Sequence, residues 1–133
     1  ILLGLYNEYG RLITDFRRFM ITNFGDRFTV LDPHLRNKNL SEAKRNAWYE
    51  DQYKHPNEVK HTIGDVLEWF TEEGFEFTYG IPNPKAFEPF SPRDKIFEQH
   101  PPGNTLDHFL VQAQLAFQGS FEGGFFTIIG RRL

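Results

Sequence analysis

The sequence contains no cysteine, and none of its apolar stretches approaches the length of a membrane-spanning helix. Without cysteine, disulfide bonds and thiolate chemistry are excluded. A membrane span needs roughly 20 apolar residues in succession, so we expect no membrane partner. The chain also lacks an excess of either charge, since 15 Lys and Arg residues stand against 18 Asp and Glu residues. The balanced charge predicts no nucleic-acid partner, and the absence of cysteine makes the reducing cytoplasm the expected compartment.

Aromatic residues are abundant instead, and 15 of the 133 residues are phenylalanine. Such a composition favours a folded core or a pocket over disorder. The length suits one globular unit, and the sequence shows no internal repeat. We therefore predict a single domain over residues 1–133.

Three stretches have the pattern of β-strands. The nearly continuous apolar run at residues 1–6 predicts a strand that is buried on both faces. Residues 75–81 alternate between apolar and polar side chains, and residues 125–130 form a final apolar strand. Between them, residues 82–102 are rich in proline and phenylalanine, which predicts an irregular surface segment.

Helical patterns separate these strands. Ser41 and Thr62 are N-cap candidates, and Asp65 follows Thr62 at the spacing of a capping box. Asn104 and Asp107 form a similar start. The predicted helices cover residues 11–24, 42–53, 63–73 and 106–117. Alternation of helices and strands predicts an α/β fold with a three-stranded mixed sheet and flanking helices.

The stretch DQYKHPNEVKHT, residues 51–62, concentrates chemically versatile side chains around one proline. His55, Glu58 and His61 are spaced three apart and would drift by about 60° per step on a helix. They therefore match a metal motif poorly, even with Asp51 as a further ligand. A structural interpretation makes Pro56 the start of a turn before the next helix. A functional one makes His55 or His61 a general base that Asp51 or Glu58 orients.

A second candidate site follows the first predicted strand. Ligands of open α/β sheets bind outside the carboxyl ends of parallel strands, which places Tyr6, Asn7, Tyr9 and Arg11 beside a pocket. The structural alternative is that Asn7 and Gly10 only form the turn, while the two tyrosines pack on the first helix.

Five segments together resemble the C-terminal part of class I S-adenosylmethionine-dependent methyltransferases that act on small molecules. They are GLYNEYGR at 4–11, DQYKHPNEVKHT at 51–62, VLEWFTEEGFEF at 66–77, HPPGN at 100–104 and GGFFTIIGRR at 123–132. The resemblance covers almost the whole chain. It implies the second half of a Rossmann-like methyltransferase fold, in which an antiparallel seventh strand inserts between the fifth and the sixth.

The resemblance implies that a parent protein transfers a methyl group from S-adenosylmethionine to a small-molecule acceptor. In that family a glycine-rich loop and acidic residues of the first half bind the cofactor, and no such loop is present here. We therefore expect a partial domain, inactive alone, that forms the acceptor side and has neither cofactor-binding nor metal-binding residues. The catalytic candidates are His55 and His61. The predicted substrate-binding residues are Tyr6, Asn7, Tyr9, Arg11, Asp51, Tyr53 and Glu58.

An alternative from another functional class is a non-catalytic α/β interaction module. Its docking surface would be the phenylalanine-rich segment 87–97, because a cluster of exposed apolar side chains is typical of a contact surface.

Overall fold

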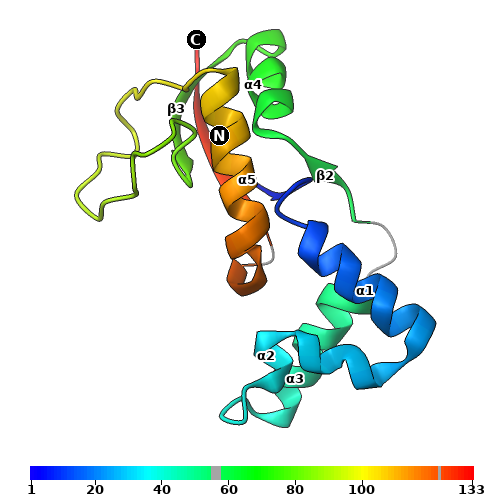
Figure 1. The fold of residues 1–133 in the computed structure, drawn as a ribbon. Helices are drawn as coiled ribbons and strands as arrows, with labels where there is room; N and C mark the ends of the chain where they lie inside the picture. Colours follow the sequence, from blue (N-terminus) through cyan, green and yellow to red (C-terminus); the bar gives the residue numbers. More distant parts are fainter. Residues whose placement is uncertain (55–57, 123) are drawn as a thin grey trace.

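The computed structural model describes residues 1–54, 58–122 and 124–133, with the backbone alone described for 118–122. It has an α/β architecture with an open, mixed, four-stranded sheet (Figure 1). In chain order the elements are β1 (Leu2–Asn7), α1 (Leu12–Phe24), a 3-10 helix η1 (Asp26–Leu31), α2 (Pro33–Arg36), α3 (Glu42–Tyr49), a π-helical turn η2 (Glu50–Lys54), β2 (Lys60–His61), α4 (Ile63–Glu72), β3 (Phe75–Ile81), α5 (Thr105–Glu122) and β4 (Phe125–Arg132).

The sheet has the strand order β2-β1-β4-β3. Strand β4 lies antiparallel between β1 and β3, which are therefore parallel to one another. Its central residues are largely buried, as expected for an apolar strand with a neighbouring strand on each side. The predicted central, antiparallel position of the last strand is confirmed.

The prediction of three strands is wrong, because a fourth strand, β2, pairs in parallel with the carboxyl end of β1. Only two residue pairs form this ladder, Tyr6 with Lys60 and Asn7 with His61. Two polar residues cannot display the alternation that identifies a strand in a sequence. The sequence pattern of the stretch 51–62 therefore does not indicate this short strand.

Strand β1 is not buried on both faces, which corrects a second expectation. Leu3 and Leu5 pack against the core, whereas Leu2 on the other face is 62% exposed. The apolar run of residues 1–6 thus supplies one covered face and one open face in the part of the chain that the structure describes.

The core lies between the sheet and helices α4 and α5. Ile63, Val66 and Phe70 of α4 meet Phe126 and Ile128 of β4 in one buried cluster. Helix α4 starts as the sequence predicts, because the Thr62 hydroxyl accepts from the Asp65 N–H and the Asp65 carboxylate accepts from the Thr62 N–H. The cap fixes the point where the chain leaves β2 and enters the core.

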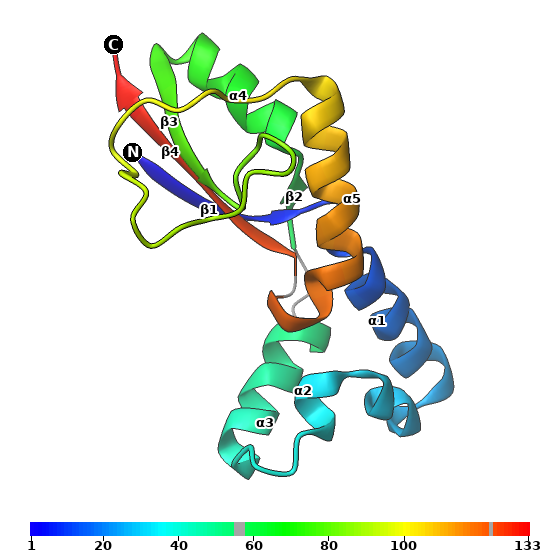
Figure 2. The ribbon, with the colours of Figure 1, turned by 60° about the vertical axis from the view of Figure 1, so that its left-hand side comes forward.

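The helices form two groups (Figure 2). Helices α4 and α5 lie beside the sheet, whereas α1, α2 and α3 gather beyond the carboxyl end of β1. Helix α5 runs from Thr105 to Glu122 and is longer than predicted. None of the helices described is long and apolar enough to cross a membrane.

Candidate functional site

The turn that follows β1 is built around Asn7, which is fully buried. Its side-chain oxygen accepts hydrogen bonds from the N–H groups of Tyr9 and Gly10, at 3.1 and 3.0 Å. Its amide nitrogen donates to the Gln112 side chain of α5 over 2.9 Å. An asparagine that binds its own backbone in this way fixes a tight turn. Asn7 therefore holds the β1 carboxyl end against α5.

Close backbone packing supports the same turn. Gly124 has φ of +74°, and a Cβ atom there would lie 2.4 Å from the carbonyl carbon of Gly10. The Asn7 N–H donates to the Gly124 carbonyl over 2.8 Å. Only glycine allows both the positive φ and this approach. The start of β4 is thus locked onto the β1–α1 turn.

Arg11, at the start of α1, is completely buried. Its guanidinium makes a bidentate pair with Glu58, with 2.6 Å between Nε and Oε1, and it also donates to the Gln52 side chain. The Arg11 guanidinium carbon lies 4.4 Å from the centre of the Tyr6 ring. Forked arginine–carboxylate pairs are the strongest and most directional ion pairs in proteins. This pair joins β1, α1, η2 and the approach to β2.

The pair extends into a network that reaches the surface. Arg18 of α1 contacts Glu58 at 3.2 Å and Asp15 at 3.3 Å, and Lys60 of β2 also binds Asp15. Arg18 donates a further bond to the Gln52 carbonyl over 2.7 Å. The network therefore ties helix α1 to both ends of the stretch 51–62 that the structure describes.

His61 pairs with Asn7 at the carboxyl end of β1. Its partly buried ring packs edge-on against Trp69 of α4, with 4.6 Å between the ring centres. His55 lies outside the described residues, so its predicted catalytic role stays untested. In the described part of the chain, Glu58 binds arginines rather than His61, so its predicted role in orienting the ring finds no contact here.

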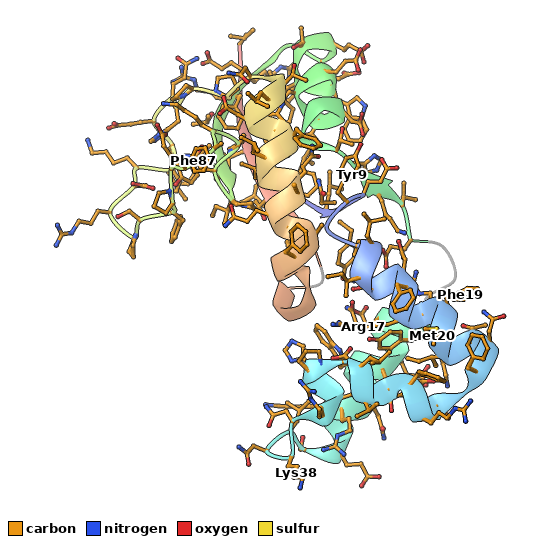
Figure 3. All side chains as sticks on the ribbon, viewed as in Figure 1. Tyr9, Arg17, Phe19, Met20, Lys38 and Phe87 are labelled. Atoms are coloured by element: carbon orange, nitrogen blue, oxygen red, sulfur yellow. The ribbon has the colours of Figure 1, made fainter. Side chains whose placement is uncertain are left out.

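The remaining predicted residues separate into different environments. Tyr9 is 44% exposed near the start of α1 (Figure 3). Asp51 is exposed and accepts a hydrogen bond from Gln52 over 2.7 Å. Tyr53 is buried, and its hydroxyl donates to Asp32 rather than toward Arg11. Among Tyr6, Asn7, Tyr9 and Arg11, only Tyr9 has a largely exposed side chain. The predicted substrate-binding residues therefore do not form one cluster.

Asp32 organises a second polar cluster that the sequence analysis missed. It is 2% exposed, caps α2 by accepting from the His34 N–H, and accepts from Trp48 over 3.0 Å and from the Tyr53 hydroxyl. Burial, followed by the hydrogen bond to Asp32, raises the pKa of Tyr53. Arg17 points from α1 toward helices α2 and α3 (Figure 3). The Asp-Pro pair at 32–33 was the available signal, since aspartate before proline is a typical helix start.

The described residues do not fit S-adenosylmethionine. The turn that follows β1, Asn7 to Arg11, has its Tyr9 and Gly10 N–H groups occupied by the Asn7 side chain. Gly124 follows a helix and precedes a strand, which is the reverse of a nucleotide-binding loop. Over residues 1–54, 58–117 and 124–133, no three His, Asp or Glu side chains gather to hold a metal ion.

Acid should weaken the Arg11–Glu58 pair that holds the β1 turn in place. Burial raises the pKa of Glu58, but the hydrogen bonds and charges of Arg11 and Arg18 outweigh burial and lower the pKa below its ordinary value of 4.5. The unfolded chain then takes up the proton first as the pH falls, so the contribution of Glu58 is complete above pH 4.5 and is lost below it. We expect the Tm to drop through this range, and to drop less in Glu58→Gln. Thermal unfolding from neutral pH to about pH 3 checks this, and equal slopes for both proteins would contradict it.

Comparisons of the chain with protein-family models, curated proteins and solved structures find no significant match.

Proposed function

We propose that this chain is the acceptor-side part of an S-adenosylmethionine-dependent methyltransferase that acts on a small molecule. The observation that carries the proposal is the arrangement of β1, β4 and β3. The last strand in sequence lies antiparallel between two mutually parallel strands. That is the order implied for the fifth, seventh and sixth strands by the resemblance of the sequence to this family.

An open sheet edge supports the same proposal. Strand β2 pairs only with Tyr6 and Asn7, so Leu2 to Leu5 have no strand partner on that side within the described residues. An unpaired edge of this kind readily accepts another strand. The cofactor-binding strands of a parent protein would continue the sheet there, in parallel with β1.

The residues of the β1 turn and of β2 define what this chain contributes. Tyr9 offers an exposed aromatic surface beside the turn, and the buried Arg11–Glu58 pair holds that turn in place. A histidine suits removal of a proton from the acceptor, because its pKa lies near neutrality. His61 and His55 are the candidates, and the proposed role of this chain is to hold the acceptor and to take its proton.

The interaction-module alternative has one observation in its favour. Phe87 and Phe97 of the segment between β3 and α5 are 92% and 77% exposed. Exposed aromatic side chains on a projecting segment suit contact with another molecule.

One experiment separates the two functions. The coding sequence upstream of Ile1 is cloned together with the chain, and the product is incubated with methyl-labelled S-adenosylmethionine and a small-molecule extract. The methyltransferase proposal predicts label in a small organic product, and removal of the upstream part should abolish that label. An upstream sequence with no strand followed by a glycine-rich loop, together with no label transfer, would overturn the proposal in favour of the module.

A further inference from the structure

A pocket of about 360 Å³ lies between α5 and the segment that connects β3 to α5. Val111 and Leu115 line it from the helix, and Pro82, Phe87 and Phe90 line it from the segment. Figure 3 labels Phe87 on the segment that follows β3. The volume lies within the range of small-molecule sites, and the lining is largely apolar and aromatic, as in such sites.

The wall formed by the segment is anchored at several points. Pro84 is fully buried and packs so closely on Gly80 of β3 that a Cβ atom there would lie 2.7 Å from the proline ring. The Ala86 N–H donates to Asp107 of α5 over 3.2 Å, and the Tyr79 hydroxyl donates to Asp94 further along. These bonds hold the pocket in shape without a ligand, which lowers the cost of binding.

The polar groups of the pocket are electrically balanced. Lys85 and Glu88 form an ion pair with one another. Asn83 is 8% exposed, and its oxygen accepts from the Lys85 N–H over 3.0 Å. Its amide nitrogen reaches Glu88 only at 3.5 Å, which leaves donor capacity at the pocket. A charged ligand would find no uncompensated opposite charge here, and burial of an unpaired charge is costly.

Phe87 occupies an unfavourable backbone conformation. Its φ is +64°, and its side chain is 92% exposed. The left-handed region is unfavourable for a residue with a Cβ atom, and glycine would avoid this cost. The phenyl group also gains little from burial in the chain itself. A contact with a bound molecule gives a physical reason for an aromatic ring at this rim.

We propose that this pocket binds an uncharged, planar aromatic small molecule that carries a hydroxyl or carbonyl oxygen. The ring packs among Phe87, Phe90 and the α5 side chains, and the oxygen accepts from the Asn83 amide. The site is built entirely from described residues of this chain. It does not require the proposed methyl transfer, so each can fail without the other.

The probe is 2-naphthol, which is flat and stays uncharged at neutral pH, and the control ligand is 2-naphthoate, which has the same ring system and a carboxylate. We expect saturable fluorescence binding of 2-naphthol to the purified chain with a Kd on the order of 100 μM, as usual for a ligand of this size. Naphthoate should bind at least about tenfold more weakly, because its charge has no partner in the pocket. Absence of saturable binding, or equal affinity for both ligands, overturns the proposal.

Two variants locate the site. Phe90→Ala should raise the Kd for 2-naphthol about tenfold, because the lost ring contact is comparable to other aromatic contacts. Phe87→Gly should raise the Kd similarly, while relief of the positive φ raises the Tm by about 3 °C. The matched control is Phe109→Ala, which removes an exposed ring from α5 outside the pocket lining. Binding equal to that of the unaltered chain in both pocket variants, or an equal loss in the control, contradicts the assignment.

Discussion

Replacement of Glu58 by glutamine is expected to lower the free energy of unfolding by about 3 kcal/mol, because it removes the carboxylate charge that is paired with the buried Arg11 guanidinium. The side chains of Arg11 and Glu58 are 0% and 7% exposed. Glutamine has nearly the same shape, so the loss reports charge and hydrogen bonding rather than packing. Urea unfolding of the purified chain measures it.

The control for this variant is Glu50→Gln. Glu50 pairs with Lys54, but both side chains are more than half exposed. Exposed pairs contribute little, and we expect no measurable change in the free energy of unfolding. If Glu58→Gln and Glu50→Gln lowered the free energy of unfolding by the same small amount, the Arg11–Glu58 pair would not be the interaction that stabilises the β1 turn.

The second large effect is a loss of turnover when a histidine of the stretch 51–62 is replaced. In a full-length parent protein, replacement of the working histidine by alanine should lower turnover by about 100- to 10,000-fold and leave cofactor affinity nearly unchanged, as expected for loss of a general base. The candidates are His61→Ala and His55→Ala, each measured by steady-state kinetics and by cofactor titration.

His108→Ala is the matched control, because His108 lies on α5 and its ring contacts the Pro102 carbonyl. It should retain full turnover. If His61→Ala and His55→Ala both retain full turnover in a folded parent, the stretch 51–62 is only a structural connection to α4, and the proton must leave by another route.

Local rules predicted much of the fold. Caps and apolar spacing gave α1, α4 and the start of α5, because a capping box and a helical stripe are decided by residues close in sequence. Strand β3 followed from alternation. The position of β4 between β1 and β3 came from the resemblance rather than from spacing, since strand order depends on contacts between distant residues.

The rest required the tertiary structure. Strand β2 comprises only Lys60 and His61, too few residues for a periodic signal. Asn7 and Arg11 were predicted beside a pocket, but nothing local indicates that Asn7 binds Gln112 or that Arg11 binds Glu58, 105 and 47 residues away. Partners at such separations become visible only when β1, α5 and the approach to β2 meet.

A calorimetric titration of S-adenosylmethionine into the 133-residue chain, and into the product of the same gene with its upstream coding sequence, tests whether this chain is the acceptor-side part of a methyltransferase. We expect micromolar binding by the longer protein and no measurable binding by the chain, because the Asn7 side chain occupies N–H groups of its β1 turn. Saturable micromolar binding by the chain alone, or no binding by the longer protein, would contradict it.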